Sequence, residues 1–79
     1  MLELKSCDKF HINNRGDVFT FYALPDLTHG DLDDLVDCEV KIDDEIYIAK
    51  GIERFALPYK RTDEVTAAFS ILVEIKKEG

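Results

Sequence analysis

Residues 10–21 constrain the fold more than any other part of the chain. Their sequence is FHINNRGDVFTF, in which two apolar runs flank a polar turn at residues 13–16. Asn and Gly tolerate the positive φ that a tight hairpin turn needs. Aromatic and β-branched side chains on both sides of the turn are typical of strands that lie on a hydrophobic core. The sequence therefore predicts a β-hairpin, around which the remaining strands can be arranged.

Alternating apolar residues predict further strands along the chain. Pro25 should end the strand that follows the turn, because proline has no amide for the ladder. In the hairpin around Asp43 and Asp44 we expect Ile46 and Ile48 to face the core, and Gly51 predicts a bulge or a sharp bend. The predicted strands are residues 2–12, with a bulge near residues 8–9, residues 17–24, the hairpin strands 38–42 and 45–49, and the long strand 65–75.

A short helix is predicted over about residues 29–36. Thr28 with Asp31 three residues later is the pattern of a capping box. Leu32, Leu35 and Val36 have the i, i+3, i+4 spacing of one apolar helix face. We expect about two turns of helix, lying over one end of the sheet.

These elements predict a single domain over residues 1–79, since 79 residues suit one small core. The expected fold class is all-β (mainly β with one short helix), as a small closed or partly open β-barrel of five to seven strands. No apolar run approaches the length of a membrane span, and the first residues lack a signal-peptide pattern, so we expect a cytoplasmic protein. Cys7 and Cys38 are expected to be free thiols, although a disulfide is possible if their strands are neighbours.

Charge is unevenly distributed along the chain. The formal net charge is −7, and residues 26–45 alone hold nine acidic residues against one basic residue, Lys41. An acidic face of this kind favours basic partners and disfavours direct contact with phosphates. The alternative interpretation is that the acids only keep a small domain soluble.

Four short segments in the same order resemble the second, β-barrel domain of elongation factor Tu and other translational GTPases. Residues 10–20, FHINNRGDVFT, are similar to that domain's F-S-I-x-G-R-G-T-V-V-T. Residues 40–42, VKI, match V-x-I; residues 50–55, KGIERF, match G-[IV]-E-x-F; residues 63–65, DEV, and the strand after them match E-N-V-G-[VL]-x-L. The resemblance implies a barrel that, in the full-length factors, helps to hold the acceptor end of aminoacyl-tRNA. Asn14 and Asp17 depart from its glycine and threonine, and no GxxxxGK[ST] motif is present.

No residue pattern predicts catalysis, a cofactor or a metal. His11 and His29 have no Ser or Cys partner at a recognisable spacing, and His11 is expected to point outward, opposite Phe10 and Ile12. The carboxylates of residues 31–34 lack the glycine and terminal glutamate of a calcium loop. The two cysteines cannot supply the four ligands of a zinc site. We therefore expect a protein that is not an enzyme.

The function hypothesis is a small acidic binding module or inhibitor that acts on a protein partner. Phage or mobile-element proteins that mimic nucleic acid are one class with this character. The residues predicted to bind protein are Asp31, Asp33, Asp34, Asp37, Arg54, Phe55 and Tyr59. For Phe55 and Tyr59, filling the barrel end and the loop is an equal alternative. The second hypothesis is an RNA- or tRNA-binding barrel associated with translation, which would use Arg15, Lys50, Arg54, Lys60 and Arg61.

Overall fold

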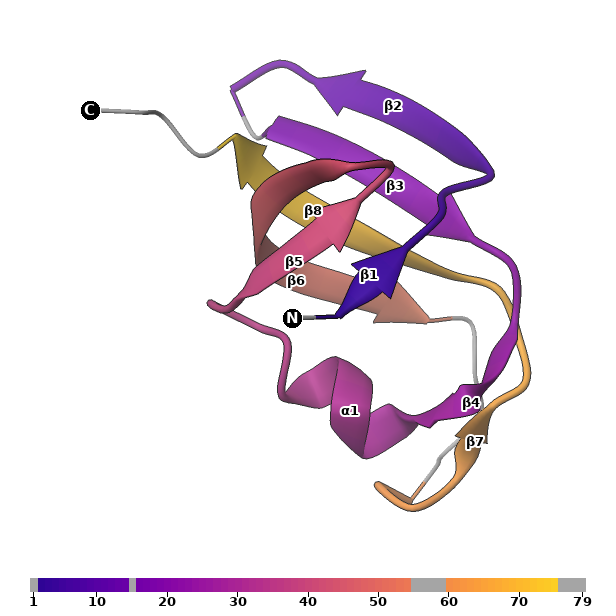
Figure 1. Ribbon diagram of the computed structural model, residues 1–79. Helices are drawn as coiled ribbons and strands as arrows, with labels where there is room; N and C mark the ends of the chain where they lie inside the picture. Colours follow the sequence, from indigo (N-terminus) through magenta and orange to yellow (C-terminus); the bar gives the residue numbers. More distant parts are fainter. Residues whose placement is uncertain (1, 15, 55–59, 76–79) are drawn as a thin grey trace.

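The computed structural model describes residues 2–14, 16–54 and 60–75 (Figure 1). These residues form eight strands and one short helix. The elements are β1 (Glu3–Leu4), β2 (Asp8–Ile12), β3 (Gly16–Phe21), β4 (Leu24–Thr28), α1 (His29–Asp33), β5 (Glu39–Ile42), β6 (Glu45–Arg54), β7 (Glu64–Val65) and β8 (Phe69–Ile75). The predicted fold class, mainly β with one short helix, is confirmed.

Six strands form one curved sheet in the order β1-β5-β6-β8-β3-β2. Neighbouring strands are antiparallel except β1 and β5, which are parallel. Within the described part of the chain, the two terminal strands β1 and β2 do not pair with each other, so the sheet is partly open. Strands β4 and β7 form a separate two-stranded sheet, and α1 lies beside them at one end of the large sheet (Figure 1).

The core lies against one face of the large sheet, here called the inner face. Strand β3 alternates strictly between half-buried and buried residues, and its buried set is Asp17, Phe19 and Phe21. The rings of Phe21 and Phe69 stack with their centroids 5.1 Å apart. Helix α1 and the turn that follows it add Leu32 and Leu35 to the same cluster. Side chains of opposite parity in these strands point to the outer face.

Eight strands form because two predicted strands are each divided in two, and because β4 forms over Leu24–Thr28, where only the end of the strand 17–24 was predicted. The segment 2–12 becomes β1 and β2, which lie at opposite ends of the large sheet; the predicted bulge at residues 8–9 is replaced by a break at residues 5–7. The segment 65–75 breaks at residues 66–68, because Val65 pairs with Leu24 in the small sheet. Apolar alternation continues across both breaks and does not reveal a change of sheet.

Two further predictions are wrong. Pro25 does not end a strand but lies within β4, next to a shift of register between Leu24 and Thr28. Proline is tolerated there because an irregular two-stranded sheet leaves amides outside the ladder. Ile46 and Ile48 do not face the core: the turn at residues 43–44 places Tyr47 opposite the buried Val40, so Tyr47 and Ala49 are the inward side chains. A shift of one residue in strand register moves every side chain of a strand to the other face of the sheet.

The predicted turns are confirmed. Asn14 and Gly16 have positive φ angles of 67° and 109° in the hairpin between β2 and β3. The register between β6 and β8 shifts between Ala49 and Gly51, as a bulge requires.

Cys7 and Cys38 are free and exposed. No helix of the described residues has the length and apolar character needed to cross a membrane.

Candidate protein-binding surface

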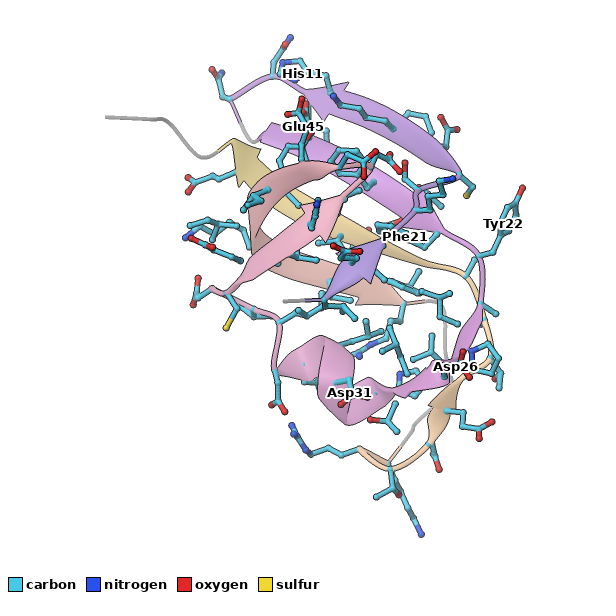
Figure 2. All side chains as sticks on the ribbon, viewed as in Figure 1. His11, Phe21, Tyr22, Asp26, Asp31 and Glu45 are labelled. Atoms are coloured by element: carbon cyan, nitrogen blue, oxygen red, sulfur yellow. The ribbon has the colours of Figure 1, made fainter. Side chains whose placement is uncertain are left out.

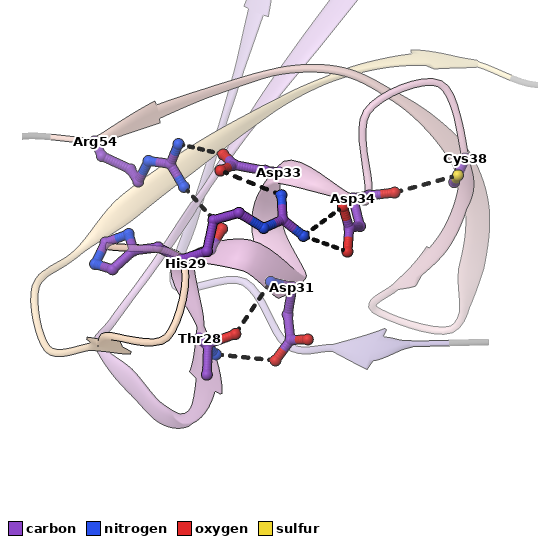
Figure 3. A network of polar contacts seen from close by, with 8 residues as sticks. Thr28, His29, Asp31, Asp33, Asp34, Cys38 and Arg54 are labelled. Carbon is purple, nitrogen blue, oxygen red and sulfur yellow. Dashed lines mark hydrogen bonds and ion pairs between the residues drawn. The ribbon is translucent and has the colours of Figure 1, made fainter. Parts of the chain in front are cut away.

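Helix α1 begins with the predicted capping box. The backbone amide of Asp31 donates to the Thr28 hydroxyl over 3.2 Å, and the Asp31 carboxylate accepts from the Thr28 amide over 2.9 Å (Figure 3). This backbone hydrogen bond is the main reason that the pKa of Asp31 lies below its usual value. The next amides, of His29 and Gly30, donate to the carbonyls of Asp63 and Arg61. The first backbone amides of the helix therefore donate their hydrogen bonds to acceptors within the chain.

The carboxylates of α1 and of the turn after it are paired with arginines from β6 and from the turn before β7. Arg54, whose side chain is only 12% exposed, lies 2.5 Å from Asp33 and also donates to the carbonyl of His29 over 3.4 Å (Figure 3). Arg61 places one nitrogen 2.9 Å from both oxygens of Asp34, and this contact raises the pKa of Arg61. We call Asp33, Asp34, Arg54 and Arg61 the α1 charge network.

The network brings together residues that the sequence assigned to two different sites. Asp37, the remaining acid of the predicted protein-binding set, lies 3.4 Å from Lys50, which is also 3.7 Å from Glu74. Three of the four predicted acids, Asp33, Asp34 and Asp37, thus lie against three of the five predicted RNA-binding cations. Lys60, which precedes Arg61 in the chain, is exposed. Arg15, Phe55 and Tyr59 lie outside the described residues, so their predicted roles stay predictions.

A second polar cluster lies under β2, on the inner face. The nearly buried carboxylate of Asp17 accepts a hydrogen bond from Nδ1 of His11 over 2.8 Å and lies 3.5 Å from the ammonium of Lys9. These contacts, the His11 hydrogen bond foremost, hold the pKa of Asp17 below its usual value. His11 lies on the face of β2 opposite Phe10 and Ile12, and its side chain is 65% exposed, as predicted. It also joins Lys9 in holding the carboxylate of Asp17 on β3.

Because His11 lies on the same face as Asp17, Phe10 and Ile12 lie on the outer face, where they are 53% and 40% exposed. They border a hollow of about 220 Å³ on the outer face of β2, β3, β8 and β6, which we call the outer-face hollow. Its walls are Phe10, Ile12, Val18, Leu72, Ser70 and Glu53. Cross-strand pairing sets this arrangement, with Val18 opposite both Phe10 and Leu72.

The sequence does not predict this hollow, because the apolar character of Phe10 and Ile12 indicates core positions for both. The signal that identifies it is the parity of β3: with Phe19 and Phe21 inward, Val18 must point outward, and the register of the hairpin then places Phe10 beside it. Tyr22, the residue after β3, is also exposed, but it projects away from the sheet and does not line this hollow (Figure 2).

A polar hollow of about 300 Å³ lies near β1 and the turn between β5 and β6. It has mixed charge, and its walls are Glu3, Leu4, Lys5, Lys41, Asp43 and Asp44. Asp43 is held by the amide and hydroxyl of Ser6, and the hydroxyl hydrogen bond is the first cause of its lowered pKa. Lys41 pairs with Glu3 over 3.5 Å. Three of the five charged wall residues of this polar hollow, Glu3, Lys41 and Asp43, are therefore engaged in contacts within the chain.

Among the residues that the structure describes, no three His, Cys, Asp or Glu side chains are grouped so that they could hold a metal ion. Comparison with known proteins gives no match to a protein family, a curated protein or a solved structure. The resemblance to the second domain of translational GTPases therefore stays a prediction.

Proposed function

We propose that this chain is a small acidic binding module that acts on a protein partner with a basic surface and catalyses no reaction. One observation carries the proposal: the chain uses most of its described basic side chains internally and leaves several carboxylates open. The basic side chains that lie within ion-pair distance of a carboxylate are Lys9, Lys41, Lys50, Arg54 and Arg61.

The open carboxylates belong to exposed residues on several elements. No basic side chain of the described residues lies within 4.0 Å of them, and they are Asp26, Asp44, Glu45, Glu53 and Glu64. With a formal net charge of −7, this arrangement gives the surface an excess of negative potential. Such a potential attracts basic surfaces and accelerates their association, most strongly at low salt.

A finer form of the proposal is an inhibitor that occupies a groove made for nucleic acid, as a phage or mobile-element protein would. The outward negative charge supports this form because a nucleic-acid groove is basic. RNA binding, in contrast, would require phosphates to displace the carboxylates that now pair with Lys50, Arg54 and Arg61.

The test is capture of partners by the immobilised full chain from lysate of its source cells, with and without nuclease, followed by elution with a salt gradient. We expect a protein that resists nuclease treatment and is released by moderate salt. Neutralising the five open carboxylates, to Asn or Gln, should release that protein at lower salt and flatten the dependence of affinity on salt. The control is the double variant Asp34→Asn with Arg61→Gln, which keeps the net charge and removes only an exposed ion pair.

Two results would contradict the proposal. One is equal salt release of the partner from the five-site variant, the control and the natural chain. The other is recovery of RNA that nuclease abolishes, which would favour the translation-associated alternative.

A further inference from the structure

The outer-face hollow has the size and lining of a site for one side chain. Its volume of about 220 Å³ is below the roughly 300–1,000 Å³ of typical small-molecule pockets. Four of its six lining residues are apolar, and two of these, Phe10 and Ile12, are among the large hydrophobic residues that the fold leaves exposed. Small apolar hollows of this kind take anchor side chains of partner proteins.

Among the described residues that line this hollow, the one charged group is an open carboxylate. Glu53 lies on β6 opposite Ser70 of β8, and no basic side chain of the described residues is within ion-pair distance of it. The acids of the α1 charge network, in contrast, each lie against an arginine. A group that enters the hollow therefore meets apolar walls and one unneutralised negative charge, which a cation beside the anchor would complement.

The wall formed by β2 is paired with β3 along its whole length. On the opposite face of β2, Lys9 and His11 contact the nearly buried carboxylate of Asp17 on β3. These contacts add to the hydrogen bonds that hold β2, and with it Phe10 and Ile12, against β3. Binding to a preformed wall avoids the entropy cost of ordering it.

We infer that the outer-face hollow binds an apolar side chain of a partner protein next to a Lys or Arg that pairs with Glu53. This inference rests on the proposed function and specifies the part of the partner that is recognised. The apolar side chain contacts Phe10, Ile12, Val18 and Leu72, and the adjacent cation reaches the Glu53 carboxylate.

The test is a titration of the ¹⁵N-labelled full chain with blocked pentapeptides, followed by NMR. The probes are acetyl-Gly-Lys-Phe-Lys-Gly-amide, the same peptide with Glu in place of both Lys, and the same peptide with Ala in place of Phe. We expect millimolar binding of the first peptide alone. Its amide shift changes should concentrate at residues 10, 12, 18, 53 and 72 and should saturate.

Matched variants assign the two parts of the site. Glu53→Gln should weaken binding of the Lys-Phe-Lys peptide about two- to fivefold, the range of an exposed ion pair, whereas Glu45→Gln on the same strand should not. Phe10→Ser should abolish the saturating shifts, whereas Tyr22→Ser, which removes an exposed aromatic outside the hollow, should leave them unchanged.

Three outcomes would overturn the inference: equal binding of the Glu-containing peptide, saturating shifts confined to the α1 charge network, or shifts at residues 10 and 12 that follow protein concentration without peptide. The last would identify a second copy of the chain as the occupant. Capture of a basic protein together with any of these outcomes would leave the proposed function standing and refute this site alone.

Discussion

Substitution of Gly16 by alanine should destabilise the domain strongly, because this residue joins two requirements that only glycine meets. Its φ of 109° lies in a region that side chains disfavour, at a cost on the order of 1–3 kcal/mol. A Cβ at this position would also lie 2.4 Å from the carbonyl oxygen of Val73. That oxygen belongs to the backbone of β8, so it cannot move without disturbing the ladder between β3 and β8.

Relieving this overlap costs about another 1–3 kcal/mol, the range of an overpacked core. Together the two terms give about 2–6 kcal/mol, a large share of the roughly 4–12 kcal/mol expected for a domain of 79 residues. The measurement is urea unfolding followed by circular dichroism, with the midpoint and slope fitted separately. We expect a lower midpoint for Gly16→Ala, and thermal unfolding lowered by about 4–8 °C for each kcal/mol.

Gly51→Ala is the matched control. Gly51 also lies in the large sheet, but its φ is not in the positive region and no atom lies within 4 Å of a Cβ built there. Alanine should be neutral or should stabilise by about 0.4–1 kcal/mol, because it reduces the freedom of the unfolded chain. Equal midpoints for the two variants would refute the close approach of residue 16 to β8 and the register of the hairpin.

Four further predictions concern the clusters that support the surface. Asp17→Ala should cost about 1–2 kcal/mol in urea unfolding, because the hydrogen bond from His11 and the nearby charge of Lys9 are lost. The folded state lowers the pKa of Asp17, so its contribution to the free energy of unfolding is complete above the unfolded pKa of about 3.9 and is lost as the pH falls through the folded pKa. Asp17→Asn should therefore flatten part of the acid limb of a stability–pH profile. An unchanged acid limb would contradict this. Arg54→Met should cost about 1–3 kcal/mol, because the half-buried Asp33 carboxylate loses its nearest cation and keeps only the 4.0 Å contact with Arg61, whereas the exposed Arg61→Met should leave the midpoint unchanged. Thr28→Ala should cost about 1 kcal/mol through loss of the helix cap, and unchanged helical ellipticity and midpoint would argue against the capping box.

Local chemistry made several parts of this fold predictable from sequence. Asn and Gly, which tolerate positive φ, indicated the hairpin turn, and the Thr28–Asp31 spacing indicated the start of α1. Both features depend only on a few adjacent residues. The strict alternation of residues 65–75 predicted a strand, and residues 69–75 of it form β8. Such features do not need knowledge of a distant partner.

Features that depend on distant partners were not predictable in the same way. Ile46 and Tyr47 are both suitable core residues, and only the pairing of β5 with β6 decides which of them is buried. The same ambiguity concealed the outward position of Phe10 and thus the outer-face hollow. In the α1 charge network, Asp33 and Arg54 are 21 residues apart, with β5 and most of β6 between them, so their pairing appears only in the folded chain.

The measurement that tests the central claim most directly is photo-crosslinking in lysate of the source cells. A benzophenone amino acid replaces Phe10 in one full-length variant and Tyr22 in another, and crosslinked peptides are identified by mass spectrometry. We predict that position 10 alone forms a nuclease-resistant adduct, with a partner peptide in which an apolar residue adjoins Lys or Arg. Equal crosslinking from position 22, or adducts to RNA, would contradict protein recognition by this surface.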